Sequence, residues 1–251
     1  MKQGFVKVAS ATPRIRVADP VYNAQVICEQ AKEAAEHGAK IVVFPELCIT
    51  GYTCNDLFLQ ELLLEKAKEA LLTIVEETGQ LEALFLVGLP VDKDGRLYNV
   101  AAVLYRGRIL GMIPKKNIPM YAEFYEGRHF TPGEETVTEY RLGKQEIPFG
   151  TNLLFRCEEL PELILGCELC EDLWVAEPPS TSHALMGATV IANLSASNET
   201  VSKDDYRTLL IKASSARLLC GYIYTSAGEG ESTQDLVFGG HDLIAENGTL
   251  L

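Results

Sequence analysis

The chain has 251 residues, of which 47% are hydrophobic and 23% are charged, as expected for a globular protein with a sizeable core. Its 22 basic residues against 35 acidic ones give a net charge of −13, which argues against nucleic acid or an anionic membrane as a partner. Neither a run of about eighteen apolar residues nor the apolar core of a signal peptide is present, so we expect no transmembrane helix and a cytoplasmic location.

Strand-like and helical patterns alternate along the chain. In chain order we expect a strand over residues 5–11, a helix over 18–38, a strand over 40–47, a helix over 57–79, a strand over 83–90, a hairpin over 97–115, a loop-rich aromatic segment over 115–150, a strand over 163–169, a short helix near 181–187, a strand over 189–195, a helix over 204–221, a strand over 222–227 and a hairpin over 236–251. Because hairpins interrupt the alternation, the sheets should be mixed rather than all parallel. No linker or repeat divides the chain, which predicts one domain over residues 1–251.

The first helix carries clear signals at both ends. Asp19 is placed to cap its N-terminus, Pro20 suits the first helical position, and Gly38 suits its end. One stripe at helical spacing should face the core, and it consists of Val21, Ala24, Cys28, Ala31 and Ala35.

The last hairpin is unusually short on its returning side. Asn247 and Gly248 form the strongest short hairpin signal, yet only three residues follow them. A returning strand usually needs about five residues. We therefore expect this chain to be a piece of a longer protein.

Two of the seven cysteines, Cys167 and Cys170, lie in the segment LGCELCEDLW. A structural zinc site needs four ligands, and the chain has no second cysteine pair and only scattered histidines. A redox pair would sit at a helix N-terminus, whereas here acidic residues follow a strand and should raise the thiol pKa. Cys167 is better interpreted as a small buried apolar residue. Cys170 is either a core cysteine or a nucleophile, and the second role requires a base elsewhere.

A base and a cation are available at two other strand ends. Glu46 follows the apolar strand and proline of KIVVFPEL, where partial desolvation should raise its pKa into the range useful for proton abstraction. Lys115 follows the strand RILGMIP and is suited to stabilise an oxyanion, although spacing alone does not separate it from Lys116. The alternatives are a loop carboxylate that caps a neighbouring amide and a solvated lysine.

Glu46, Lys115 and Cys170 would each lie just past a buried strand, where α/β sheets gather their catalytic groups. A carboxylate base, an ammonium group and a thiol together suit attack on the carbon of an amide or a nitrile. As the nucleophile, Cys170 should be accessible to substrate, while Cys167 should be inert inside the sheet.

The segments around these residues resemble a known family. FPELCITGY, PKKNIPMYAEFYEGRHFTPG and CEDLW are similar to motifs of the nitrilase superfamily of carbon–nitrogen hydrolases, whose triad is Glu-Lys-Cys. The longer segments PELCITGYTCNDLF, IPMYAEFYEGR and NLSASNETVSKDDYRTLL resemble, more narrowly, the glutaminase domains of glutamine-dependent NAD synthetases. This resemblance runs through essentially the whole chain.

The resemblance implies an α/β fold, a four-layer αββα sandwich of nitrilase type with mixed sheets. It makes Glu46 the general base and Cys170 the nucleophile. Lys115 would lie beside the oxyanion, rather than Lys116, because it holds the slot after the Ile-Pro pair. The backbone N–H of Glu171 would contribute to the oxyanion hole.

The resemblance also implies L-glutamine as the substrate. The residues that it places at the binding site are Tyr121, Ser197, Lys203, Glu126, Tyr52 and Glu171. Lys203 fills a slot that can be arginine in relatives, and a lysine would grip a carboxylate more loosely. For Glu126 the alternative role is that of a structural acid that holds Lys115.

A second domain of that enzyme type is missing from the sequence. It makes NAD and binds ATP with an SGGxDS loop, whereas this chain has only FGGHDL at residues 238–243, inside an expected hairpin. We therefore expect no metal and no organic cofactor here, with ATP and Mg²⁺ needed only by a missing C-terminal synthetase domain. Since the superfamily commonly pairs through a helical face, we also expect a homo-oligomer.

Two other functions remain open. A free-standing ω-amidase or N-carbamoyl amide hydrolase of the same superfamily would use the same three catalytic residues. A binding or regulatory domain with a degenerate site would not need them, so the presence of Glu46, Lys115 and Cys170 argues against it. A glutaminase assay separates an enzyme from such a domain.

Overall fold

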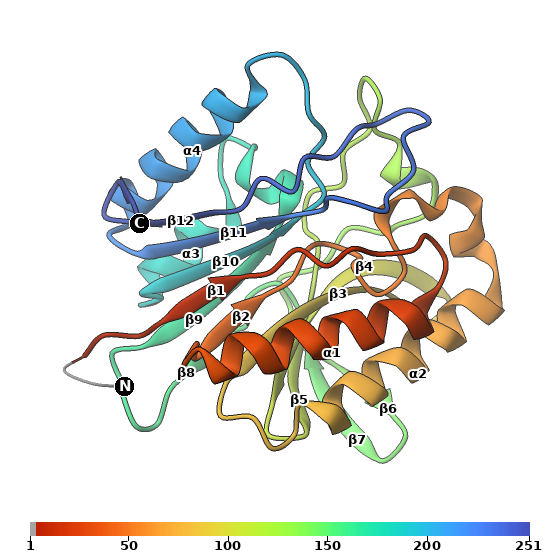
Figure 1. Cartoon of the computed structure of the whole chain (residues 1–251), viewed down its shortest axis with the longest axis horizontal. Coiled ribbons are helices and arrows are strands. Elements are labelled where there is room, and N and C mark those ends of the chain that lie inside the picture. Colours follow the sequence, from red (N-terminus) through yellow and green to blue (C-terminus); the bar gives the residue numbers. More distant parts are fainter. Residues whose placement is uncertain (1–3) are drawn as a thin grey trace.

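The computed structural model describes residues 4–251 and stacks two β-sheets face to face, with helices on both outer faces (Figure 1). The strands of the first sheet are, in spatial order, β1 (Val8–Ser10), β2 (Ile41–Val43), β3 (Leu84–Lys93), β4 (Arg96–Tyr105), β5 (Arg108–Pro114), β7 (Gln145–Phe149) and β6 (Thr138–Leu142). Those of the second sheet are β13 (Thr249–Leu250), β12 (Leu243–Glu246), β11 (Gly221–Ser226), β10 (Val190–Ser195), β9 (Ile164–Leu169) and β8 (Phe155–Arg156). The fold is therefore the αββα sandwich that the sequence predicts.

Four α-helices and three short 3₁₀ helices complete the described part of the chain. The α-helices are α1 (Pro20–Glu36), α2 (Glu61–Glu77), α3 (Pro179–Leu185) and α4 (Lys203–Leu218). The 3₁₀ helices are η1 (Tyr52–Leu59), η2 (Glu126–Arg128) and η3 (Cys170–Leu173). Figure 1 shows α1 and α2 on one outer face of the sandwich and α4 on the opposite one. No helix within residues 4–251 is long and apolar enough to cross a bilayer.

Both sheets mix strand directions, as the predicted hairpins require. In the first sheet β1, β2 and β3 are parallel, whereas β3, β4 and β5 form an antiparallel meander. In the second sheet β9, β10 and β11 are parallel, and β8 and β12 flank them in the antiparallel direction. The carboxyl ends of β2 and β10 meet at one edge of the sandwich, where Glu46 N donates to Ser195 O at 3.3 Å.

The apolar core follows these layers. One cluster fills the space between the two sheets, and its central side chains include Val43, Leu86, Cys167 and Leu194. A second cluster lies between the first sheet and helices α1 and α2, and a third between the second sheet and α4. Burial of these apolar side chains is the main term that stabilises the sandwich, because each removes its surface from water.

The ends of α1 confirm the capping prediction, but one predicted core position is wrong. The Asp19 side chain accepts a hydrogen bond from Tyr22 N at 3.1 Å, Pro20 is the first helical residue, and Gly38 has φ +85° after the helix. Val21 is 58% exposed, and the buried face instead includes Ile27. Ala24, Cys28 and Ala31 of the predicted stripe are buried, so the stripe is wrong only at its first position.

Two further expectations need correction. The segment 115–150 is not all loop, because β6 and β7 form a hairpin on the edge of the first sheet. The last hairpin begins only at β12, so residues 236–242 lie outside it. Its turn is as predicted: Asn247 and Gly248 adopt φ +48° and +84°, the left-handed values of a two-residue hairpin turn.

Candidate active site

Glu46 lies on a tight turn after β2 and is fully buried. The turn passes over Gly88 of β3 so closely that a Cβ there would lie 2.3 Å from Leu47 N and 2.6 Å from Pro45 O. Only glycine fits at this position. The packing of the turn against β3 therefore holds the glutamate inside the protein rather than on a solvated loop.

Three groups hold the Glu46 carboxylate. Its Oε1 accepts hydrogen bonds from Asn99 Nδ2 at 2.7 Å and from Lys115 Nζ at 2.8 Å. Its Oε2 accepts from Ala196 N at 2.9 Å. Sequence reasoning missed Asn99, although an asparagine within the apolar strand LYNVAAVLY was a usable signal. The backbone oxygen of Asn99 also accepts a hydrogen bond from Lys115 N at 2.8 Å, so Asn99 contacts both Glu46 and Lys115.

Lys115 lies at the centre of this cluster and is 0% exposed. Besides Glu46, its ammonium group donates to both carboxylate oxygens of Glu126, at 2.7 and 2.9 Å. Burial disfavours its charge, but the carboxylates of Glu126 and Glu46 raise the pKa of Lys115 well above its ordinary value. Lys116 instead reaches the surface and pairs with Glu135 at 2.7 Å. Of the two neighbouring lysines, only Lys115 belongs to the buried cluster.

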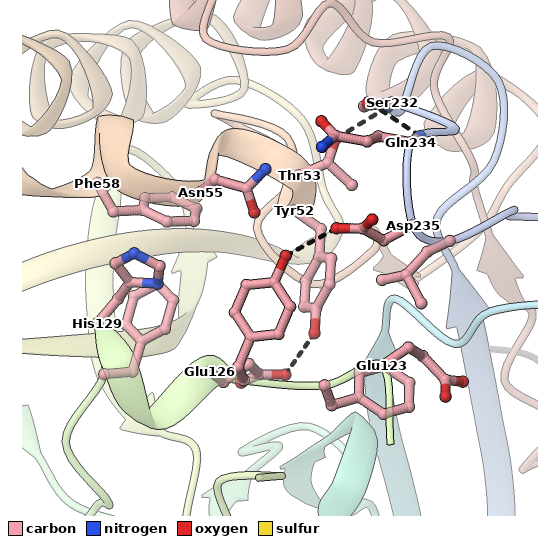
Figure 2. A pocket seen from close by; sticks show the side chains of 14 residues that line it. Tyr52, Thr53, Asn55, Phe58, Glu123, Glu126, His129, Ser232, Gln234 and Asp235 are labelled. Carbon is pink, nitrogen blue, oxygen red and sulfur yellow. Dashed lines mark hydrogen bonds between the residues drawn. The ribbon is translucent and has the colours of Figure 1, made fainter. Parts of the chain in front are cut away.

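Glu126 and Tyr52 extend the cluster on the far side of the lysine. Burial raises the pKa of the Glu126 carboxyl group, against the effect of the Lys115 charge, and the Glu46 charge raises it further. The Tyr52 hydroxyl donates to Glu126 Oε1 at 2.8 Å, as Figure 2 shows. These contacts favour the alternative role for Glu126, a structural acid that holds Lys115, over direct contact with substrate.

Cys170 begins η3 directly after β9, with φ +40°. Such a conformation is strained for a residue with a side chain and persists only where its surroundings enforce it. The expected accessibility is wrong for this conformation, because Cys170 is only 6% exposed. Burial raises the pKa of its thiol, and the Glu46 charge raises it further, while Lys115 opposes both. The thiol is therefore neutral at rest and needs a base.

Cys167 has a different environment from Cys170. It is 1% exposed and packs in the apolar layer between the sheets. Burial and the nearby Glu168 charge raise the pKa of its thiol well above the ordinary value. No group of three or more His, Cys, Asp or Glu side chains within residues 4–251 is arranged to hold a metal ion. The prediction that Cys167 is a buried apolar residue is confirmed.

Tyr121 and Glu171 form a pair near the nucleophile. The Tyr121 hydroxyl donates to the two Glu171 carboxylate oxygens at 3.1 and 2.9 Å. Tyr121 is 54% exposed, so this pair lies at the surface end of the site. Burial raises the pKa of the Tyr121 hydroxyl, and the hydrogen bond to Glu171 raises it further. Glu171 directly follows Cys170 in η3, which places the pair beside the nucleophile.

Lys203, at the start of α4, and Ser197, just after β10, also lie near the site. The Lys203 ammonium lies over the rings of Trp174, at 5.3 Å, and Phe124, at 5.5 Å, and donates to Asn198 Oδ1. Burial lowers the pKa of Lys203, which the nearby Cys170 charge partly offsets. Ser197 is 2% exposed, and its hydroxyl accepts from Arg207 Nη2 at 3.3 Å. The structure therefore brings all the predicted site residues to one edge of the sandwich.

A cleft opens beside the cluster, and Figure 2 shows its lining. Tyr52 and Glu126 form part of its wall, together with the acidic side chains of Glu123 and Asp235. Neither Lys115 nor Cys170 is among the lining residues. Within residues 4–251, Tyr52 and Glu126 belong both to the cluster and to the wall of the cleft.

We expect Tyr52→Phe to lower the turnover number of the glutamine hydrolysis that the sequence predicts, by roughly tenfold or less. The substitution removes one hydrogen bond to the buried Glu126 carboxylate. Tyr125→Phe is the matched control, since its hydroxyl lines the same cleft but donates to Asp235 at 2.8 Å, away from the cluster. Steady-state kinetics of the two variants checks this. Equal losses in both would show that Tyr52 acts through the cleft and not through Glu126.

Comparison with known proteins gives consistent results. A family model described as carbon-nitrogen hydrolase matches residues 7–248. The chain is 44% identical over 250 residues to the glutamine-dependent NAD(+) synthetase of Mycobacterium tuberculosis, a match that covers 100% of this chain and 37% of that protein. The fold matches the crystal structure of a glutamine-dependent NAD(+) synthetase from Cytophaga hutchinsonii with a TM-score of 0.88 and 29% identity, covering 98% of this chain and 40% of that one.

A more distant structure shares the fold alone. The NitN amidase from Nesterenkonia sp. AN1 aligns with a TM-score of 0.77 at 20% identity, covering 98% of this chain and 88% of the amidase. This chain therefore spans most of the amidase but well under half the length of the synthetases that it matches.

Proposed function

The chain belongs to the carbon–nitrogen hydrolase family, and we propose that it hydrolyses the side-chain amide of L-glutamine as the glutaminase part of a glutamine-dependent NAD(+) synthetase. The observation that carries the proposal is the buried cluster of Glu46, Lys115 and Glu126 beside the strained turn of Cys170. Identity over the whole chain to such a synthetase favours this function over that of a free-standing ω-amidase.

The proposed reaction starts with proton transfer from the neutral Cys170 thiol to Glu46. The thiolate then attacks the side-chain carbonyl carbon of glutamine and forms a tetrahedral oxyanion beside Lys115 and the Glu171 N–H. Glu46 returns the proton to the nitrogen, the carbon–nitrogen bond breaks, and ammonia leaves a γ-glutamyl thioester. Glu46 next takes a proton from water, whose oxygen attacks the thioester carbon. The carbon–sulfur bond then breaks, Glu46 returns the proton to the Cys170 sulfur, and glutamate leaves.

The charges of the cluster fit these roles. The two carboxylates of Glu46 and Glu126 accept hydrogen bonds from the one ammonium group of Lys115, which offsets the negative charge of the cluster. Since desolvation keeps Cys170 protonated, the base must act within the site rather than relying on bulk water. Lys115, with its raised pKa, supplies a constant positive charge where the oxyanion develops.

We propose that the surface end of the site recognises the amino-acid part of glutamine. Glu171 and Tyr121 offer a carboxylate and a hydroxyl that suit an α-amino group. Lys203 offers a cation for the α-carboxylate, and Ser197 a further polar contact. The two sides together would select an α-amino acid over a simple amide.

Lys203→Met is expected to raise the KM for glutamine roughly tenfold or more with little change in the turnover number, because it removes a charge that binds substrate and transition state alike. Lys212→Met, an exposed lysine on the same helix, is the control. Initial rates over a range of glutamine concentrations check this. A fall in the turnover number with KM unchanged would place Lys203 in the chemistry instead.

The remaining parts of the proposal concern the whole protein. Residues 1–251 would form one glutaminase domain that needs no metal and no organic cofactor. Its ammonia would pass to a synthetase domain outside this chain, which would use ATP and Mg²⁺ to amidate nicotinic acid adenine dinucleotide. We propose that the protein acts as a homo-oligomer in the cytoplasm. Light scattering that finds only monomers at high concentration would contradict the proposed oligomer.

The decisive assay measures glutamate and ammonia released from glutamine by the purified chain, with short ω-amides and N-carbamoyl amino acids as competing substrates. We expect glutamine to be preferred, and calorimetry to detect no tight ATP binding. A preference for the other amides would favour the free-standing hydrolase. Absence of all hydrolysis, with the protein folded, would favour a binding domain.

A further inference from the structure

Asp172 is a buried carboxylate that the proposed reaction does not use. Its side chain is 1% exposed. Within the described residues its hydrogen-bond partners are all N–H groups rather than cations. Because burying a charge without a cation is costly, this position points to a specific task.

The N–H groups come from two separate turns. Leu169 N donates to Asp172 Oδ2 at 3.0 Å, within the turn that carries the nucleophile. Asn117 donates to Asp172 Oδ1 through both its N and its Nδ2, each at 2.8 Å. Lys116 N, the residue before it, lies 3.4 Å from Oδ2. One carboxylate therefore joins the turn after β9 to the turn after β5.

These two turns belong to different sheets and carry the two groups that must act together. Lys115 directly follows β5 of the first sheet, and Cys170 directly follows β9 of the second. The bond from Leu169 to Asp172 spans Cys170 itself, whose φ of +40° needs such support. A small slip of one sheet over the other would separate nucleophile and ammonium, and misplacement by about 1 Å can cost a hundredfold in rate.

We propose that Asp172 is a positioning residue that fixes the Cys170 nucleophile relative to the Lys115 ammonium group across the two sheets. This inference rests on the proposed function, since it assigns Asp172 to the same reaction. Burial raises the pKa of Asp172 to about 6, so at neutral pH it keeps the charge with which it accepts these hydrogen bonds.

The test is Asp172→Asn in the full chain. The amide has the same shape, but its NH₂ group must face N–H donors, so at least one link between the turns is lost. We expect the turnover number for glutamine to fall roughly tenfold to a hundredfold with KM little changed.

Glu168→Gln is the matched control. Glu168 is also 1% exposed and also two residues from Cys170, but it accepts from Ser180 N at 2.8 Å and from the Tyr222 hydroxyl, away from Lys115. Both variants should lose thermal stability, and only Asp172→Asn should lose turnover. A wild-type turnover number in Asp172→Asn, or an equal loss in Glu168→Gln, would overturn the proposal.

Two further measurements keep the outcome clear. Should Asp172→Asn not fold, Asn117→Ala removes one of the same links and decides the matter, since a lower turnover number supports the proposal and an unchanged one overturns it. Alkylation of Cys170 by iodoacetamide does not depend on glutamine, and it should be slower in Asp172→Asn than in the wild type, while an equal or faster rate contradicts the proposal. A wild-type chain that hydrolyses no glutamine would refute the proposed function separately.

Discussion

Cys170→Ala should abolish glutamine hydrolysis while the protein stays folded. The substitution removes the only protein atom that forms a covalent bond with the substrate in the proposed reaction, and neither Glu46 nor Lys115 replaces a thiol as the nucleophile. Truncating so small a side chain should cost about 1 kcal/mol of stability or less. A coupled assay for glutamate, together with a circular dichroism melting curve, measures both effects.

Cys167→Ala is the control, because Cys167 carries the same side chain three residues earlier and is buried in β9, between the sheets. It should lose a little stability and keep its activity. A glutamine-mimicking electrophile should label Cys170 alone, because it reacts only after it has bound at the glutamine site. Peptide mass mapping can show which cysteine carries the label. Loss of activity in a folded Cys167→Ala, or zinc that co-purifies with the protein, would restore the redox or metal interpretation of the cysteine pair.

Removing either charge of the Glu46–Lys115 pair should have the next largest effect. Glu46→Gln keeps the shape of the side chain but takes away the base, so the turnover number should fall by about a hundredfold to ten-thousandfold. Lys115→Met removes the charge beside the oxyanion and should cost about a hundredfold to a thousandfold. It also leaves Glu46 and Glu126 facing each other without a cation, so the folded protein should take up a proton there and lose stability.

Lys116→Met is the control for this pair, since Lys116 pairs with Glu135 at the surface. Its turnover number should stay close to that of the wild type. Initial-rate kinetics of the purified variants over a range of pH gives the comparison. If Lys116→Met were the damaging change, the assignment of the catalytic lysine would be off by one residue.

Much of the site could be predicted because its residues follow a simple rule of α/β proteins. Glu46, Lys115 and Cys170 each come directly or almost directly after a buried strand, and each strand ends at the same edge of the sandwich. The apolar runs that mark those strands are easy to recognise. The polar residues that follow them were therefore recognisable as candidates, and the family resemblance selected Lys115 over Lys116.

The second layer of the site was not predictable in this way. Asn99 lies in the middle of β4 and faces the cluster, but a single polar residue in a strand does not reveal which groups it meets. The role of Glu126 depends on how the segment between β5 and β6 folds, because that fold starts η2 at Glu126 and places its carboxylate against Lys115. Burial of Cys170 likewise depends on packing between the two sheets, since local sequence specifies only that a strand ends there.

The buried face of α1 and the hairpin of β6 and β7 also depend on contacts that the local sequence does not reveal. The predicted stripe of α1 included Val21, yet Asn23 is buried at that end, because its side chain bonds to the Arg16 backbone and donates to Ile49 O at 3.0 Å. Tertiary hydrogen bonds thus made a polar residue part of the core. The hairpin of β6 and β7 was missed because each strand has only five residues and the edge strand β6 buries only Tyr140.

The central claim is that Cys170 forms a covalent thioester with the substrate, and one measurement tests it directly. The chain is mixed with glutamine, the reaction is quenched in acid within the first turnovers, and the intact protein and its peptides are weighed by mass spectrometry. We predict an added mass of one γ-glutamyl group on the peptide that contains Cys170, an adduct that Cys170→Ala lacks and that Glu46→Gln, without the base, forms far more slowly. Steady hydrolysis of glutamine with no adduct on Cys170, or with the adduct on another residue, would contradict the account.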